Sequence, residues 1–208
     1  MAHDDKQRTG KQVWQRLIDG NMRFVQGLFQ GRNLLDLRRT LTQGQQPEAA
    51  VLCCSDSRVP AEIIFDQSLG DLFVVRTAGL VLDPTSIGSL EYAVAHLHVP
   101  LLVIKGHEGC GAVTAAVNHP ETDEGHISAI VKQIAPAAAK ARATGKSGAA
   151  LVEEATCHHL KYLKKALCEK SRIISEALDQ ERLDLVVAKY ELKSGRVLLL
   201  KATFFESF

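Results

Sequence analysis

Two short apolar runs, each followed at once by a polar loop, constrain the fold of this chain more than any other feature. The first is "AAVLCC" over residues 49–54, which precedes "SDSRVP", and the second is "LLVIK" over residues 101–105, which precedes "GHEGCG". Apolar runs of this length are typical of strands that helices cover on both faces of a parallel sheet. Ligands in such sheets bind beyond the carboxyl ends of the strands. We therefore expect both loops to face one crevice.

Other strand and helix patterns alternate along the chain. Strands are predicted at residues 72–76, 183–192 and 196–200, and "KSG" joins the last two as an antiparallel hairpin. Helical periodicity covers residues 86–98 and a basic amphipathic stretch over about 150–178, in which Cys157 and Cys168 are expected to be partly buried. The predicted fold is α/β, with a mostly parallel sheet flanked by helices and a C-terminal antiparallel hairpin.

The N-terminal region is predicted to be helical. An apolar stripe at helical spacing runs from Lys11 to Leu28 despite Gly20, and indicates one long or broken helix. We expect this helix to begin a helical arm over about residues 11–40. The alanine-rich residues 135–150 are expected to form a helix and a loop. Because 208 residues is the size of one ordinary domain, a single domain over residues 1–208 is expected.

Composition limits the classes of partner. The chain has 25 basic and 24 acidic side chains and a formal net charge of +1, so no overall field favours nucleic acid or an anionic membrane. No run approaches the roughly 20 apolar residues that span a bilayer, and the N-terminus lacks an apolar signal region. We expect a cytoplasmic protein with a small-molecule partner. Its five cysteines, an odd number, argue against a disulfide framework and for thiols or metal ligands.

Three potential metal ligands lie where the two buried strands end. Cys54 closes the first strand, and His107 and Cys110 form a His-x-x-Cys pair after the second. Thiolates and imidazole are ligands that zinc favours, and three of them leave a fourth position open for water. A structural zinc module more typically has two Cys-x-x-Cys knuckles, which this sequence lacks. The spacing alone leaves open the alternative of buried thiols and a hydrogen-bonded core histidine.

Asp56 and Arg58 follow Cys54 closely enough to point into the same crevice, in an extended or a turn conformation. A bidentate ion pair would keep Asp56 ionised and away from the metal. Because two thiolates cancel the formal charge of Zn²⁺, the metal should acidify its water less than one held by three imidazoles. An oriented carboxylate would then assist the proton transfer. The alternative is a structural ion pair that stabilises the loop.

Four motifs occur in the order "CSDSRVP", "GDLFVVRTAG", "SLEYAV" and "GHEGCGAV", preceded by "LIDGNMRFVQG". Together they resemble the β-class carbonic anhydrases, and the similarity extends from about Trp14 to the final hairpin. The resemblance implies a zinc ion held by Cys54, His107 and Cys110. It also implies that Asp56 and Arg58 form a catalytic dyad.

The same resemblance implies an activity and an assembly. The activity is reversible hydration of CO2 to bicarbonate and a proton by zinc-bound hydroxide, and the assembly is a homodimer or a dimer of dimers. Gln45, Phe73 and Tyr92 match family positions that line the substrate cleft across the dimer interface. A turn glutamine and two core aromatic residues are the alternative for these three positions.

The chain departs from the family pattern near the expected site. Glu108 follows the metal histidine, where a small hydroxyl residue is common. Val51 stands where the bicarbonate-regulated subgroup has tryptophan, although Arg76 and Tyr190 match the rest of that regulatory pocket. The incomplete pocket argues against bicarbonate inhibition. Cys53 is expected to pack within its strand rather than to act as a redox switch.

Two other functions are compatible with these residues. One is hydrolysis of carbon disulfide or carbonyl sulfide, because zinc hydroxide also attacks those molecules and access to the cleft decides between the substrates. The other is a zinc sensor or binding protein with little turnover, in which Glu108 or Asp56 closes the fourth zinc position. A dinucleotide-binding role is not supported, because no G-x-G-x-x-G follows a strand.

Overall fold

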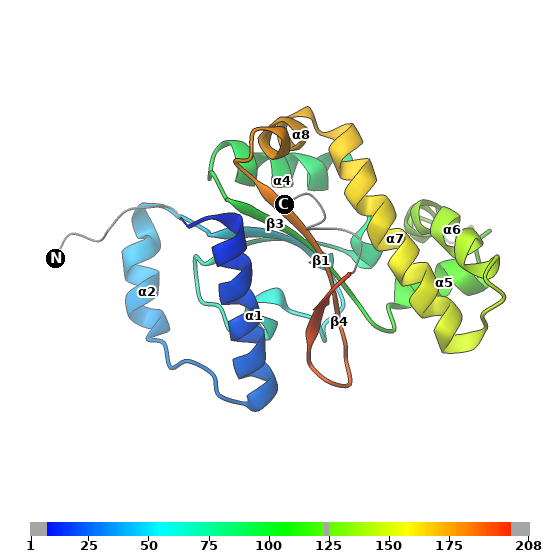
Figure 1. Ribbon diagram of the computed structural model, residues 1–208, viewed down its shortest axis with the longest axis horizontal. Coiled ribbons are helices and arrows are strands. Elements are labelled where there is room, and N and C mark those ends of the chain that lie inside the picture. The colour runs from blue at the N-terminus through cyan, green and yellow to red at the C-terminus, as the bar shows by residue number, and fades with distance from the viewer. Residues whose placement is uncertain (1–7, 123–124, 201–208) are drawn as a thin grey trace.

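The computed structural model describes residues 8–122 and 125–200, and its centre is a five-stranded sheet (Figure 1). The strand order is β2-β1-β3-β4-β5, and all neighbours pair in parallel except β4 and β5, which are antiparallel. This confirms the predicted α/β fold and its C-terminal hairpin. The strands are β1 (Ala49–Cys54), β2 (Leu72–Thr77), β3 (Leu101–His107), β4 (Asp184–Tyr190) and β5 (Val197–Leu199).

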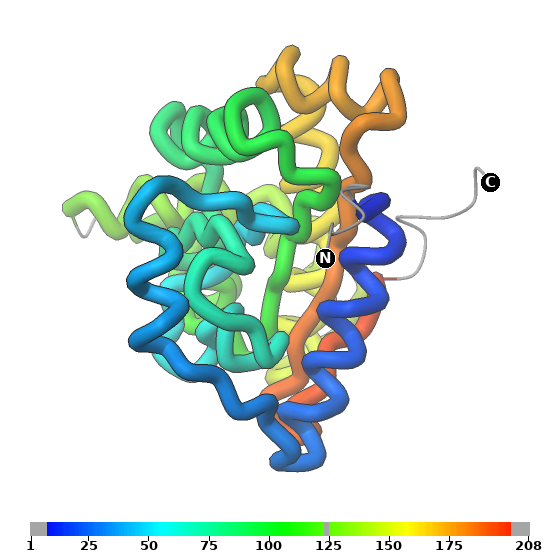
Figure 2. Tube along the Cα trace, turned by 90° about the vertical axis from the view of Figure 1, so that its left-hand side faces the viewer, coloured from blue at the N-terminus to red at the C-terminus, as the bar shows by residue number. Residues whose placement is uncertain are grey.

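Helices surround the sheet. Figure 1 shows α5, α6 and α7 together at one end of the molecule and α2 at the other, while Figure 2 shows α1 running beside β4. Among residues 8–122 and 125–200, no helix combines the length and the apolar character that crossing a membrane requires. The helices are α1 (Gly10–Gln26), α2 (Leu34–Thr40), α3 (Ala61–Ile64), α4 (Pro84–Ala95), α5 (Gly111–Asn118), α6 (Ile127–Arg142), α7 (Gly148–Lys170) and α8 (Arg172–Asp179), with 3-10 turns η1 (Leu41–Gln43) and η2 (Ala78–Leu80).

The two central strands, β1 and β3, form the core of the sheet. Every residue of both strands is buried, which explains their unbroken apolar runs, whereas the edge strand β2 is only half-buried. From β1 the chain continues to β2 on one side and to β3 on the other, so the strand order reverses between β1 and β3. Ligands of open α/β sheets bind at such a reversal, beyond the carboxyl ends of the strands. The two polar loops that follow β1 and β3 begin at this place.

Helix α1 is one continuous helix rather than a broken one. Thr9 caps its N-terminus in a capping box with Gln12, and Gly27 ends it in the left-handed conformation. Gly20 is required by a close contact: a Cβ at this position would lie 1.9 Å from the backbone oxygen of Phe65, just after α3. The glycine therefore allows α1 to pack directly on the chain that leaves α3.

The amphipathic stretch predicted as one segment over residues 150–178 is two helices, α7 and α8. Ser171 separates them: its hydroxyl accepts a hydrogen bond from the backbone N–H of Ile174 and donates one to Glu91 on α4. The apolar pattern continues across the break, so periodicity did not reveal it. The partial burial predicted for Cys157 and Cys168 is confirmed, as is the helix and loop over residues 135–150.

Asp66 holds the N-terminal arm against the core. Its side chain is 2% exposed and accepts hydrogen bonds from Arg23 Nε at 2.6 Å and Arg32 Nη1 at 2.8 Å. Burial opposes ionisation of this carboxyl, but the hydrogen bonds from Arg23, Arg32 and Gln30 outweigh it and lower the pKa of Asp66. The end of α1 and the segment leading to α2 are thereby tied to the segment after α3.

We expect Asp66→Asn to lower the free energy of unfolding at pH 7 by about 3 kcal/mol, because two partly buried guanidinium groups lose their anion. A lowered folded-state pKa stabilises the protein above the unfolded-chain pKa of about 3.9, and this contribution disappears as the pH falls through the folded-state pKa. The difference between the two proteins should therefore shrink below about pH 4. Urea unfolding from pH 3 to 7 measures it. A difference that does not vary with pH would contradict this role of the Asp66 charge.

Candidate metal centre

Cys54, His107 and Cys110 converge beyond the carboxyl ends of β1 and β3. Cys54 ends β1, His107 ends β3, and Cys110 is the N-cap residue of α5. Their potential ligand atoms all lie within 4.8 Å of one another, and the two sulfur atoms are 4.0 Å apart. All three residues are buried. The sequence therefore identified a real cluster of potential ligands, because β1 and β3 are neighbours that end at the same edge.

The ring of His107 is oriented as a metal ligand would be. Its Nδ1 lies 2.9 Å from the backbone oxygen of Glu108, which can only accept, so Nδ1 carries the proton. Its Nε2 is buried, has no hydrogen-bond partner among the residues that the structure describes, and offers a lone pair to the cluster. Ligating histidines commonly fix their tautomer in this way through a backbone carbonyl. A metal ion would satisfy this otherwise unpartnered nitrogen.

Each of the two thiols, once ionised, opposes the ionisation of the other. The hydrogen bond with the Cys110 thiol lowers the pKa of Cys54, and the same interaction raises the pKa of Cys110 because a second negative charge so close is unfavourable. Backbone N–H groups at the start of α5 act in the opposite direction on Cys110. A divalent cation would favour both sulfurs as thiolates. Two buried thiols and one imidazole lone pair fit the donor set of zinc.

Asp56 is held beside the cluster by Arg58. The guanidinium donates in bidentate fashion, from Nε to Oδ1 at 2.9 Å and from Nη2 to Oδ2 at 2.6 Å, and the Arg58 backbone N–H also reaches Oδ1 at 2.9 Å. These hydrogen bonds hold the pKa of Asp56 well below its usual range. Asp56 Oδ2 lies 4.0 Å from His107 Nε2. An ionised carboxylate in a fixed orientation therefore borders the ligand cluster.

Arg76 and Lys105 support the site from the sheet, and sequence reasoning did not assign either a structural role. Arg76 donates from Nε to the Cys54 oxygen at 3.0 Å and from Nη2 to the Asp56 oxygen at 2.6 Å. Lys105 is fully buried, donates to the Val59 oxygen at 3.1 Å, and has a pKa that burial lowers to about 8. Both pair in register with Cys53, which is itself fully buried. The sequence placed Lys105 at the end of a buried strand, but its hydrogen bond to Val59 joins segments that are distant along the chain and was not predicted.

Glu108 does not face the ligand cluster. Its carboxylate accepts a hydrogen bond from the Leu192 backbone N–H at 3.1 Å, and its own N–H donates to the Tyr190 oxygen at 2.9 Å. Glu108 is thus bound to the connection between β4 and β5. This geometry disfavours the alternative in which Glu108 closes a fourth metal position.

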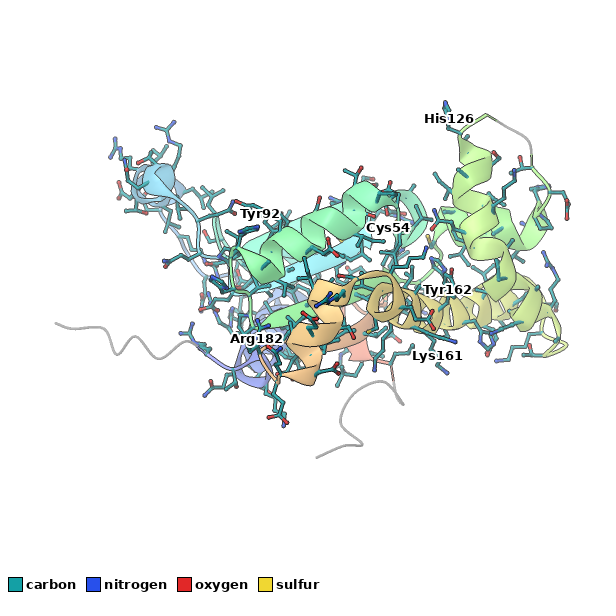
Figure 3. The ribbon with its side chains drawn as sticks, turned by 90° about the horizontal axis from the view of Figure 1, so that it is seen from above. Cys54, Tyr92, His126, Lys161, Tyr162 and Arg182 are labelled. Atoms are coloured by element: carbon teal, nitrogen blue, oxygen red, sulfur yellow. The ribbon has the colours of Figure 1, made fainter. Side chains whose placement is uncertain are left out.

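The structure does not bring Gln45, Phe73 and Tyr92 to the cluster of the same chain. The rings of Phe73 and Tyr92 lie 6.2 Å apart, but Phe73 pairs with Ala50 near the start of β1. Four residues of strand, roughly 13 Å, separate that point from Cys54. Gln45 is exposed and precedes β1. Figure 3 likewise shows Tyr92 toward one end of α4 and Cys54 toward the other.

Comparisons with known proteins agree with this geometry. The family model for carbonic anhydrase matches residues 49–197, which include the cluster, Asp56 and Arg58. The chain belongs to the carbonic anhydrase family, in its β class. It is 43% identical to carbonic anhydrase 2 of Mycobacterium tuberculosis over 191 residues, which cover 90% of this chain and 91% of that protein.

Solved structures of β-carbonic anhydrases have the same fold. CafA of Aspergillus fumigatus superposes with a TM-score of 0.75 at 30% identity, covering 81% of this chain and 82% of that one. A β-carbonic anhydrase of Sordaria macrospora, described as tetrameric, has a TM-score of 0.73 at 25% identity, covering 81% and 87% of the two chains. The resemblance predicted from the sequence motifs is confirmed.

Two adjacent cysteines provide a matched test of the metal centre. We expect Cys54→Ala to lose bound zinc, because it removes one of three ligands, and Cys53→Ala to retain it, because successive strand residues face opposite sides of the sheet. Elemental analysis after dialysis against a weak chelator, well below the unfolding temperature of either variant, measures the zinc content. Equal zinc retention by the two variants would contradict the assignment of Cys54.

Proposed function

We propose that this chain is a zinc-dependent carbonic anhydrase that interconverts CO2 and bicarbonate, the activity that its family membership indicates. The observation that carries the proposal is the cluster of Cys54, His107 and Cys110, whose ligand atoms lie within 4.8 Å of one another, with a restrained carboxylate beside it. These three side chains would hold the zinc ion. When bound, zinc lowers the pKa of water at the site and so supplies a nucleophile near neutral pH.

Asp56 is proposed to orient the reacting water and to accept a hydrogen bond from it. Of the two carboxylate oxygens, Oδ2 lies 4.0 Å from the unpartnered nitrogen of His107, so it is the oxygen that faces the cluster. Because Arg58 keeps the pKa of Asp56 low, the carboxylate receives a hydrogen bond without retaining the proton at neutral pH. The Arg58 side chain is 54% exposed, so the dyad borders solvent, to which the proton is released.

Neutralising Asp56 tests this role. We expect Asp56→Asn to lower kcat/KM for CO2 hydration by about 10²- to 10⁴-fold with zinc still bound, the usual contribution of a positioned acid or base. Stopped-flow CO2 hydration on zinc-loaded protein measures the rate. Glu108→Gln is the matched control, because Glu108 adjoins the same histidine but is bound to the hairpin.

The two outcomes that contradict this proposal are distinct. An Asp56→Asn variant with the unsubstituted rate would remove Asp56 from the mechanism. Absence of hydration by the unsubstituted, zinc-loaded protein would overturn the activity itself, and carbon disulfide and carbonyl sulfide would be the next substrates to assay.

A homodimer or a dimer of dimers is proposed as the working assembly. The edge strand β2 is half-buried although its sequence is apolar, and α2 has no buried residue, with Leu34 and Leu35 more than half exposed. An apolar edge strand and the exposed leucines of α2 are surfaces that a second copy would cover. One solved relative is described as tetrameric, which supports a higher assembly.

A dimer would explain why the three residues predicted to line the substrate cleft lie away from the cluster of their own chain. A cavity of about 300 Å³ opens along β2 and is lined by residues from Phe73 to Thr77 and by the start of α4. Phe73, Tyr92 and Gln45 lie toward the amino end of β1, away from the cluster of their own chain. We propose that they complete the cleft of a second copy, with Gln45 orienting the substrate.

Mixing two inactive variants tests this exchange. We expect Gln45→Ala and Cys54→Ala to be impaired as separate proteins and to regain activity after joint unfolding and refolding, because each mixed dimer has one site with both residues intact. Stopped-flow hydration before and after mixing measures the recovery, and Cys54→Ala mixed with His107→Ala is the control that should not recover. Absence of recovery in mixed dimers isolated by different affinity tags would contradict the exchange.

We also propose how the chain is divided into domains and in which compartment it works. We propose one domain over residues 1–208, working in the cytoplasm on CO2 and bicarbonate rather than on nucleic acid. A formal net charge of +1 supports the choice of a small-molecule partner.

A further inference from the structure

The Gly79 peptide connects the metal cluster to a buried histidine outside it. Gly79 lies in η2, immediately after β2, and its N–H points at Cys54 Sγ with an N–S distance of 3.4 Å. The carbonyl oxygen of the same residue lies 2.8 Å from Nε2 of His159 on α7. One residue thus donates to a proposed metal ligand and accepts from a histidine 80 positions later in the chain.

The backbone at Gly79 leaves room for no other residue. Its φ angle is 68°, in the left-handed region, and a Cβ there would lie 2.7 Å from Ile134 Cδ1 and 2.8 Å from Ala112 Cβ. Ala112 belongs to α5, whose N-cap is the proposed ligand Cys110, and Ile134 belongs to α6. The peptide is therefore packed between two helices, while a side chain from α7 holds its oxygen.

His159, which makes this contact with Gly79, lies in the core. It is 1% exposed, and its ring stacks on Tyr162 with centroids 6.5 Å apart; Figure 3 labels Tyr162 on α7 together with Cys54. Because a carbonyl oxygen only accepts, Nε2 carries the proton. Its Nδ1 is buried with no partner among the described residues, and burial lowers the pKa of the ring, so the histidine is neutral. Among the described residues, the hydrogen bond to the Gly79 oxygen is therefore the one that this ring makes.

We propose that His159 is a positioning residue for the metal centre: it holds the Gly79 peptide so that the Gly79 N–H donates to the Cys54 sulfur. The inference rests on the proposed zinc site and adds a residue that touches neither metal nor substrate. A backbone N–H aimed at a thiolate stabilises its negative charge and fixes the direction of its lone pairs. Outer hydrogen bonds of this kind typically contribute 10- to 100-fold to metal affinity.

Two substitutions of His159, whose side-chain amides lie at different distances from the backbone, test the proposal. The side-chain amide of His159→Gln can take the place of Nε2 and donate to the Gly79 oxygen, whereas the shorter His159→Asn places its amide near the position of Nδ1. We expect the asparagine variant to release zinc to a chromogenic chelator about 10- to 100-fold faster than the unsubstituted protein, and the glutamine variant to remain close to it. Cobalt-substituted protein gives a second readout, because the sulfur-to-cobalt charge-transfer band should shift in the asparagine variant and be restored in the glutamine variant.

A control separates this effect from a general weakening of α7. Thr156→Val removes a buried hydroxyl three residues earlier on the same helix, where the hydroxyl donates a hydrogen bond to the Val152 backbone oxygen. Zinc release from this variant should match the unsubstituted protein. Equal release rates from the glutamine and asparagine variants, or a Thr156→Val effect as large as that of the asparagine variant, would overturn the proposal. Failure of the unsubstituted protein to bind zinc would instead overturn the proposed function.

Discussion

The parallel pairing of β1 with β3 is the interaction on which the rest of the structure depends. It places Leu52 opposite Ile104 and Cys53 opposite Lys105, so both strands end at one edge of the sheet. The ligand atoms of Cys54 and His107 lie there within 4.8 Å of each other. Because side chains alternate between faces, a shift of one residue in this register would turn Cys54 toward the opposite face. The ligand cluster is therefore a consequence of this register.

Three positively charged side chains around this edge each donate hydrogen bonds to an acceptor within the protein. Arg58 binds the Asp56 carboxylate, Arg76 binds the backbone oxygens of Cys54 and Asp56, and Lys105 binds the Val59 oxygen. They hold the loop after β1 in one conformation without occupying the space between the sulfur atoms. The potential metal ligands at the cluster are therefore two thiols and one imidazole nitrogen, with a restrained carboxylate oxygen beside them. Three such ligands fit a divalent cation with one position open to water.

Apolar spacing in the sequence predicted those features of the fold that depend on neighbouring residues along the chain. The apolar runs located β1 and β3, and the helical stripe located α1, because burial on two faces or on one face leaves a period in the sequence. The break at Ser171 left no such mark, since apolar spacing continues through it and the decisive contact is with Glu91 on a distant helix. The role of Gly20 was hidden for a similar reason, because the atom that excludes a side chain belongs to Phe65.

The sequence by itself determined the fold class and the family, because apolar runs and short motifs carry both. It also named Cys54, His107 and Cys110, because the order of those motifs resembles the family pattern. Only the tertiary structure decided that Glu108 turns away to the hairpin, that Phe73 and Tyr92 lie far from the Cys54 of their own chain, and that His159 reaches Gly79. These outcomes depend on contacts between segments that are distant along the chain. A side chain's direction is set by the elements packed around it, and that packing has no counterpart in the spacing of residues along one segment.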